Sequence, residues 1–312
     1  MNISSENNAT QCQPQQLHVA IPVLLAIFSM GGFIFNSISL WIFWFVIKRW
    51  NSGIMLQFNL ALADAIILPV CPLMVTYFSL GNHWPFGEFL CQVQVFLLST
   101  HLYGSIYFLM LISVHRYQAI VHYSSRSLWR KKSFLKKLAL VVWVLLFLQG
   151  LPLFFYLKTS VSGKSVKCLS IHQSEMIYLY LILGIILAVC CFLLPFMVSL
   201  TSYVMLGMHV AKINQASLQG RVMKTRSIQM VTVALVIFAI CFAPLHVFRT
   251  VGTIVKYYRM SCELLRHIEM GYYISLVLTM MNCCLDPFIY NFANEKFHKS
   301  FSHALRKWST SA

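Results

Sequence analysis

Two acidic residues lie inside long apolar stretches of the sequence, where a charge is costly. Asp64 is the only charged residue between positions 53 and 84, and Asp286 is the only one between positions 270 and 294. Ionisable groups at membrane depth face the interior of a helical bundle and often serve ion paths or switches. The ordinary explanation is a pair of hydrogen-bonded structural acids. The alternative is a polar hub that binds a cation such as sodium and couples its occupancy to helix movement.

The histidines give no sign of catalysis. His101, His122 and His246 are scattered, and the spans lack a His-x-x-x-His pair, a Ser–His–Asp set and a glycine-rich phosphate loop. We interpret each of the three as a packing or hydrogen-bonding residue. The sequence therefore predicts that the protein is not an enzyme.

Composition indicates that lipid is the main solvent of this chain. Of 312 residues, 59% are hydrophobic and 10% are charged, whereas soluble domains carry about 25% charged residues. The net charge of +16 would suggest nucleic acid in a soluble protein, but no nucleic-acid-binding module is visible. Basic residues can instead signal topology in a membrane protein.

Seven apolar runs are long enough to cross the hydrocarbon core, which takes about 20 residues. The runs lie at 19–47, 53–84, 89–114, 138–157, 176–210, 227–248 and 270–294. We predict an all-α membrane protein, a seven-transmembrane helical bundle over residues 19–293. An outer tail (1–18) precedes it, and a short amphipathic helix with a cytoplasmic tail (294–312) follows. A transporter is the less favoured alternative, because internal repeats are absent and two deep acids make a poor substrate path.

The distribution of Lys and Arg predicts the orientation. With the N-terminus outside, 17 of these residues fall on the cytoplasmic side and 7 on the outside. The first 47 residues contain neither type, and the sequons at Asn2 and Asn8 would then be open to glycosylation. We expect a multi-pass plasma-membrane protein with its C-terminus in the cytoplasm.

The segment after the last span has the pattern of a helix that lies on the membrane surface. Phe297, Phe301, Leu305 and Trp308 recur at helical spacing. Four cations, Lys296, Lys299, Arg306 and Lys307, would face anionic lipid headgroups. Membrane lipids are thus an expected partner.

The ten cysteines divide by position. Six lie in apolar runs and are interpreted as small core residues: Cys71, Cys190, Cys191, Cys241, Cys283 and Cys284. Four lie toward the outside, where oxidation is favoured: Cys12, Cys91, Cys168 and Cys262. Four cysteines allow three pairings, and spacing does not choose among them.

Motifs along the whole chain resemble those of rhodopsin-like G-protein-coupled receptors. They occur in order, one or more on each expected helix: Asn36, Asn59–Asp64, Trp84–Gly87 before Cys91, His115–Tyr117, Trp143, Pro195 with Tyr203, Phe238–Pro244, and Asn282 with Asp286–Tyr290. The resemblance implies a disulfide between Cys91 and Cys168, and leaves Cys12 to pair with Cys262. It also implies a heterotrimeric G protein as partner.

A narrower resemblance lies in the sixth helix. Residues 242–249 are similar to the Pro-x-His-x-x-Arg pattern of nucleotide (purinergic) receptors and their relatives, a group that includes receptors for lysophospholipids and carboxylates. Arg249 would hold a phosphate or carboxylate through paired hydrogen bonds; the ordinary alternative is an arginine that reaches the headgroups. A single-headed anionic lipid suits this site at least as well as a nucleotide. The predicted ligand residues are Arg249, His246, Ser99, Tyr103, Tyr272, Tyr273 and Lys167.

The same resemblance implies a conformational switch that transmits ligand binding to the G protein. Ligand binding would shift Phe242, Phe238 and Pro244 and move the sixth helix outward, so that Arg116 and Tyr203 meet the G protein. The remaining switch residues would be His115, Tyr117, Asp286, Pro287 and Tyr290. Sodium, the one ion expected, would be held by Asp64, Ser105, Asn282 and Asp286. No other cofactor is expected.

One residue departs from the family pattern. His115 stands where the family has an acid that pairs with the adjacent arginine and holds the inactive state. A neutral histidine cannot form that pair. The expected consequence is raised basal activity, and the alternative is a receptor-like protein with altered or no signalling.

Overall fold

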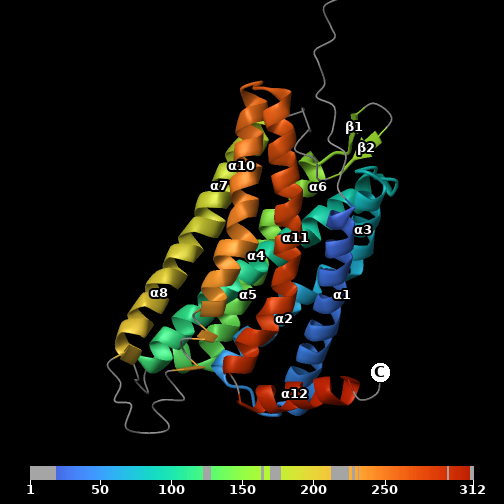
Figure 1. The fold of residues 1–312 in the computed structure, drawn as a ribbon. Helices are drawn as coiled ribbons and strands as arrows, with labels where there is room; N and C mark the ends of the chain where they lie inside the picture. Colours follow the sequence, from blue (N-terminus) through green and yellow to red (C-terminus); the bar gives the residue numbers. More distant parts are fainter. Residues whose placement is uncertain are drawn as a thin grey trace, which may run out of the picture.

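The computed structural model describes residues 19–121, 128–162, 165–168, 177–211, 225–226, 229–230, 232–293 and 295–309. Seven helical spans in these parts are long and apolar enough to cross a membrane, which confirms the predicted bundle (Figure 1). Helices form because lipid offers no hydrogen bonds, so each span must satisfy its own backbone groups.

Most spans are built from more than one segment. The first is α1 (Ala20–Trp41) with η1 (Ile42–Val46), and the second is α2 (Ser52–Ala65), η2 (Leu68–Val70) and α3 (Cys71–Ser79). The third is α4 (Gly87–Ile120); η3 (Leu128–Arg130) precedes the fourth, which is α5 (Lys132–Gly150) with α6 (Leu153–Tyr156). The fifth is α7 (Ile177–Ile186), η4 (Leu187–Leu193) and α8 (Leu194–Ala211), and the sixth ends in η5 (Ile237–Phe242) and α10 (Ala243–Tyr257). The seventh is α11 (Cys262–Ala293), and α12 (Glu295–Ser309) follows it.

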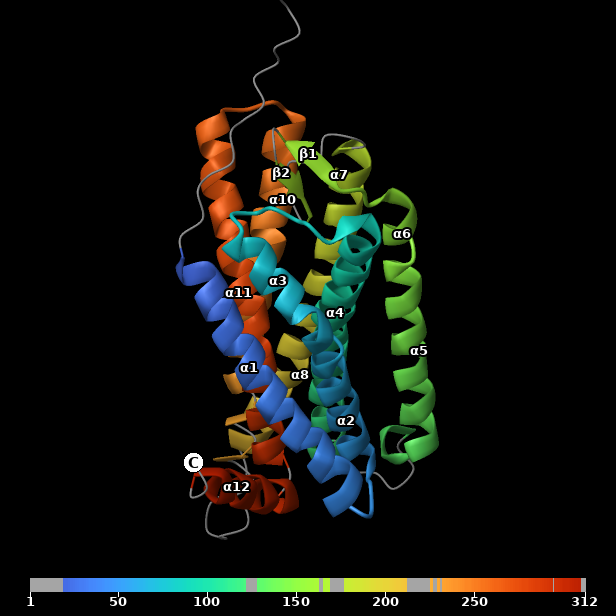
Figure 2. The same ribbon diagram turned by 90° about the vertical axis from the view of Figure 1, so that its right-hand side faces the viewer.

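The third and seventh spans form the centre of the bundle. In the most apolar stretch of each span, 67% of the residues are buried in α4 and 61% in α11, against 11% in the fifth span. Figure 1 shows α8 at one edge of the bundle, and Figure 2 shows α5 at another. Polar side chains that avoid lipid are therefore concentrated on α4 and α11.

Prolines mark the breaks within the spans. Pro69 lies in the short 3-10 segment η2, and Pro195 and Pro244 each follow a π-helical segment that ends two residues earlier. Proline lacks an amide N–H and its ring clashes with the carbonyl four residues back, so the helix must bend or widen there. The break at η5 sets the direction in which α10 leaves the core.

A small hairpin covers part of the outer end. Strands β1 (Ser160–Ser162) and β2 (Ser165–Lys167) pair antiparallel, with Val161 opposite Val166. The backbone N–H of Trp84 donates to the Val166 carbonyl over 2.8 Å, and the Cys91–Cys168 disulfide ties the strand's end to α4. Together these links hold Lys167 against the bundle.

At the inner end, α12 crosses beneath the bundle, as the sequence predicted (Figures 1 and 2). The ring of Phe297 lies 5.1 Å from Phe43 and 5.6 Å from Tyr290, measured between centroids. Phe301 packs on Phe297 and faces Phe35. The apolar side of α12 is therefore anchored to the first and seventh spans.

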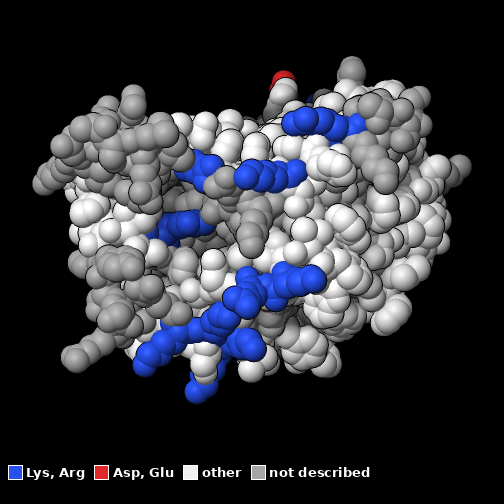
Figure 3. Space-filling view, turned by 90° about the horizontal axis from the view of Figure 1, so that it is seen from below, with Lys and Arg blue, Asp and Glu red and all other residues white. Residues whose placement is uncertain are grey.

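Basic side chains gather on this inner face. Figure 3 shows Lys and Arg spread across it. Exposed cations on this side come from several elements: Lys48, Arg49, Lys131, Lys132, Lys136, Lys137, Arg226, Lys299 and Arg306. The arrangement agrees with a cytoplasmic face, although the orientation itself stays a prediction.

Candidate functional site

Arg249 is a half-buried cation in the outer half of the sixth span. The described part of the chain supplies no carboxylate that forms an ion pair with it. Its charge acts on three phenol groups from three other spans, namely Tyr103 on α4, Tyr180 on α7 and Tyr272 on α11. Four spans thus converge on one guanidinium.

His246 lies one turn inward of Arg249 and is buried. Its ring stacks on Phe192 at 4.6 Å between centroids and lies 5.7 Å from Tyr103. The His246 Nε2 atom is buried and forms no hydrogen bond within the described residues, and the Tyr103 hydroxyl faces the Arg249 guanidinium. A buried polar group without a partner costs about 1–3 kcal/mol, so His246 is suited to a polar ligand.

A second cluster lies further out, around Glu269 of α11. The Tyr273 hydroxyl donates a hydrogen bond to the Glu269 carboxylate, and the charge of Glu269 acts on Lys167 and Lys256. Lys167 is buried, and its Nζ forms no hydrogen bond within the part of the chain that the structure describes. Burial lowers the pKa of Lys167, and the Glu269 carboxylate opposes that fall.

The predicted ligand residues therefore divide into two neighbouring groups. Arg249, His246, Tyr103 and Tyr272 lie together, whereas Lys167 and Tyr273 gather around Glu269. The rings of Tyr272 and Tyr273 are 5.9 Å apart and connect the two groups. Ser99 is half-buried one turn before Tyr103 on α4.

Sequence reasoning missed Glu269 and Tyr180. Glu269 could have been noticed as an acid among the outer cations. For Tyr180 the sequence carries no such signal, because its position opposite Arg249 depends on how the fifth and sixth spans pack.

The predicted sodium ligands come together in the core. The Ser105 hydroxyl donates to Asp64 Oδ1 over 2.9 Å, and the Asn282 amide donates to Asp286 Oδ2 over 3.0 Å and to Asp64 Oδ1 over 3.4 Å. All four side chains are buried. His101 joins them, with Nδ1 3.4 Å from Asp64 Oδ1. Sodium at this cluster stays a prediction.

The predicted coupling residues lie toward the inner end. The charge of Arg116 acts on Tyr203, which is buried. His115 Nε2 lies 3.1 Å from the Ser52 hydroxyl, at the start of α2. Tyr290 and Pro287 lie in the inner part of α11, next to α12, and Tyr117 is half-buried on α4. Phe238 and Phe242 lie between these residues and the Arg249 group. Their rings meet edge to face, with centroids 5.9 Å apart.

Among the described residues, the disulfides agree with the pairing that the family resemblance implies. Cys91 and Cys168 form a disulfide, and Cys262 is also disulfide-bonded. Its predicted partner Cys12 and the sequons at Asn2 and Asn8 lie outside the described residues.

Comparison with known proteins fits this architecture. Residues 35–290 match the model of the 7 transmembrane receptor (rhodopsin family). The chain therefore belongs to the rhodopsin family of seven-transmembrane receptors, so it is a G-protein-coupled receptor and not an enzyme. Seven spans and this membership also make it a multi-pass plasma-membrane protein.

Its curated relatives lie in the purinergic branch. Purinoceptor 2 of Mus musculus is 32% identical over 280 residues, which cover 89% of this chain and 75% of the relative. Purinoceptor 4 of Rattus norvegicus is 30% identical over 288 residues, 92% of this chain and 80% of the relative. Purinoceptor 1 of Gallus gallus is 31% identical over 294 residues, 93% of this chain and 80% of the relative.

Proposed function

We propose that this receptor binds an extracellular anionic small ligand at Arg249 and activates a heterotrimeric G protein. Nucleotides, lysophospholipids and small carboxylates share the required chemistry, and the relatives named as purinoceptors favour nucleotides. The proposal rests on one observation. A half-buried guanidinium has no carboxylate partner among the described residues, and its charge acts on phenol groups from three other spans.

The chemistry of these groups suits a phosphate or a carboxylate. A guanidinium binds either one through two parallel charge-assisted hydrogen bonds. The Tyr103 and Tyr272 hydroxyls and His246 would donate to the remaining oxygens. Such a ligand would contact α4, α10 and α11 at once, so its affinity would depend on how these helices are arranged.

Helix movement would transmit the binding free energy. We propose that the sixth span swings outward at its inner end, with η5 and Pro244 as the flexible point. A ligand shifts such an equilibrium only by the difference between its affinities for the two arrangements. A few kcal/mol is enough, and the Phe238–Phe242 contact lies directly between Arg249 and the inner end.

A second-messenger screen with nucleotides, lysophospholipids and carboxylates tests the proposal. For the active ligand, Arg249→Ala should lower potency about 10- to 100-fold, because a hydrogen bond to a charged group contributes about 1.5–3 kcal/mol. Arg249→Lys should recover part of the loss. Arg266→Ala is the matched control, since Arg266 is exposed on α11. A ligand whose potency ignores Arg249 would remove the anion proposal.

The Glu269 cluster distinguishes the ligand classes. A polyphosphate needs further cations, and Lys167 with Lys256 could supply them only in competition with the Glu269 carboxylate. Glu269→Gln removes that competing charge and keeps the hydrogen-bonding shape. Nucleotide potency should then rise several-fold, whereas a single-headed lysophospholipid bound at Arg249 should keep its potency.

A further inference from the structure

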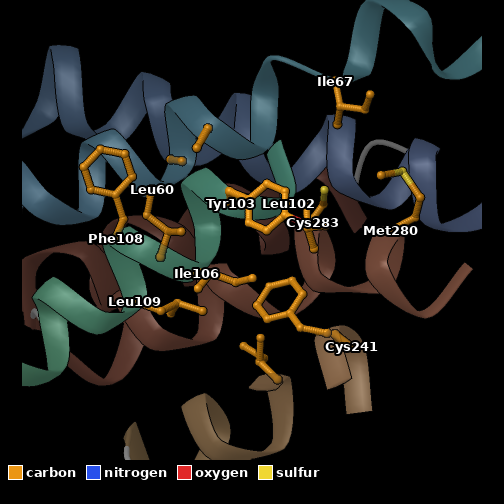
Figure 4. Packing of buried hydrophobic residues seen from close by; sticks show 14 of the residues in the cluster. Leu60, Ile67, Leu102, Tyr103, Ile106, Phe108, Leu109, Cys241, Met280 and Cys283 are labelled. Atoms are coloured by element: carbon orange, nitrogen blue, oxygen red, sulfur yellow. The ribbon is translucent and has the colours of Figure 1, made fainter. Parts of the chain in front are cut away.

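Three metal-binding residue types meet in the core, from three different spans. Asp64 comes from α2, His101 from α4 and Cys283 from α11, and one ligand atom of each lies within 4.8 Å of the others. His101 Nδ1 is 3.4 Å from Asp64 Oδ1, and His101 Nε2 is 3.6 Å from Cys283 Sγ. All three side chains are buried. Figure 4 shows Cys283 within the cluster of buried apolar residues that also contains Leu102 and Met280.

Several oxygen atoms of this cluster form no hydrogen bond within the described residues. They are Asp64 Oδ2, Asp286 Oδ1 and Asn282 Oδ1, and all three are buried. Two of them belong to carboxyl groups, and the third belongs to the amide that donates to both of these groups. Buried acceptors are costly when unsatisfied, and a cation satisfies several of them at once.

The donor set includes more than the oxygen ligands of the sodium ion that the family resemblance implies. Sodium prefers oxygen ligands, and Asp64, Ser105, Asn282 and Asp286 would provide them. Imidazole nitrogen and thiolate sulfur select transition metals instead, and here His101 and Cys283 stand directly beside Asp64. Zinc accepts carboxylate oxygen, imidazole nitrogen and thiolate sulfur as ligands.

We propose that Asp64, His101 and Cys283 bind a divalent transition-metal ion, Zn²⁺, inside the bundle. One ligand atom of each residue lies within 4.8 Å of the others, close to the spacing around one tetrahedral ion with bonds of about 2.0–2.3 Å. His101 faces Asp64 with Nδ1 and Cys283 with Nε2, so only one of these two nitrogens would bind the ion. Small side-chain rotations would bring one His101 nitrogen, Cys283 Sγ and an Asp64 oxygen onto the same ion.

Charge balance supports a divalent ion. Binding would release the thiol proton of Cys283 to solvent, as thiol ligation requires. One carboxylate, one thiolate, one neutral imidazole and Zn²⁺ then sum to zero with the neighbouring Asp286 protonated, which suits an apolar core. The ion would also link α2, α4 and α11, and so stabilise their present arrangement.

Cobalt spectroscopy on the purified full-length receptor in lipid nanodiscs tests the site. Co²⁺ replaces Zn²⁺ at such sites, and a Co²⁺–thiolate bond absorbs in the near ultraviolet. Wild type should develop this band and lose it when Zn²⁺ is added. Cys283→Ser should lack the band, and His101→Asn should need at least tenfold more Co²⁺. Cys241→Ser is the control, because Cys241 is buried on η5 outside the cluster.

Thermal unfolding of the same samples provides the second measurement. Zn²⁺ should raise the unfolding midpoint of wild type and of Cys241→Ser, and should leave Cys283→Ser unchanged. If Cys283→Ser does not fold, His101→Asn decides, since it retains the thiol and should lose most of the shift. The proposal is overturned if wild type shows no thiolate band, if the band survives in Cys283→Ser, or if Na⁺ raises the midpoint and Zn²⁺ does not.

Discussion

His115 replaces an acid beside Arg116, and its surroundings explain how a histidine fits there. Its Nε2 lies 3.1 Å from the Ser52 hydroxyl. A Cβ at Gly53 would lie 3.2 Å from His115 Cε1, so the adjacent glycine leaves room for the ring. The histidine therefore connects α4 to the start of α2 and leaves the Arg116 guanidinium without the neighbouring carboxylate of the family pattern.

An acid at position 115 should lower the basal activity of the receptor. His115→Asp would place a carboxylate next to Arg116 and stabilise the inactive arrangement, so basal G-protein activation should fall about fivefold or more, equivalent to about 1 kcal/mol. Nucleotide exchange on the G protein without ligand measures it. Ser52→Ala removes the histidine's partner without adding an acid and should not lower basal exchange. Unaltered basal exchange in His115→Asp would contradict the prediction.

At this scale the sequence was most informative where a residue's type is unusual for its position. Arg249 was predicted because it completes a Pro-x-His-x-x-Arg pattern at the end of an apolar run, and Asp64 because an acid interrupts such a run. His101 and Cys283 were interpreted as packing residues, since histidine and cysteine are ordinary components of a core. Only their closeness to Asp64 in the folded structure indicates that they could bind a metal ion.

At the scale of elements, one hydrogen bond connects the sixth and seventh spans at the proline break. The Thr279 hydroxyl of α11 shares its proton between the Cys241 carbonyl of η5 and the Ser275 carbonyl of its own helix, each 2.9 Å away. The π-helical turn before Pro244 alters the usual backbone pairing, and Thr279 satisfies a carbonyl there. The bond stabilises the arrangement in which the sixth span packs on the seventh.

Removing this bond should favour outward movement of the sixth span. Thr279→Val keeps the shape and deletes the hydroxyl, which contributes about 0.5–1.5 kcal/mol, so basal signalling should rise about two- to tenfold. A second-messenger assay without ligand measures it. Thr201→Val is the control, because the Thr201 hydroxyl donates to the Met197 carbonyl of its own helix. Equal effects of the two substitutions would argue against a special role for Thr279.

Apolar runs predicted the number and order of the spans because lipid enforces length and helicity. They predicted the ends less well. The sixth span continues past Arg249 to Tyr257, and α11 begins at Cys262, eight residues before its apolar run. Helices extend beyond the hydrocarbon wherever neighbours or water satisfy their polar side chains. The β1–β2 hairpin was not predicted, since its strands are only three residues long.

For the whole molecule, tertiary contacts between distant spans were the least predictable feature. The clusters around Glu269 and around Asp64 each bring together residues from three or more elements. Periodicity shows which face of a helix is apolar, but it does not show which neighbour that face meets. The motif resemblance predicted that Asn282 and Asp286 lie together with Asp64. It did not predict that His101 lies beside Cys283.

The orientation in the membrane is the last prediction, and it follows from the asymmetry of charge. The exposed cations of the inner face and of α12 (Figure 3) should meet anionic lipid headgroups, which concentrate in the cytoplasmic leaflet. An epitope tag at the N-terminus, or after Asn82 in the first outer loop, should then be stained on intact cells. A tag after Ala312 should be stained only after permeabilisation. Glycosidase treatment should shift the wild-type band and leave the double variant Asn2→Gln, Asn8→Gln unshifted. Staining of both termini from the same side would contradict seven crossings, because an odd number must place the two ends on opposite faces.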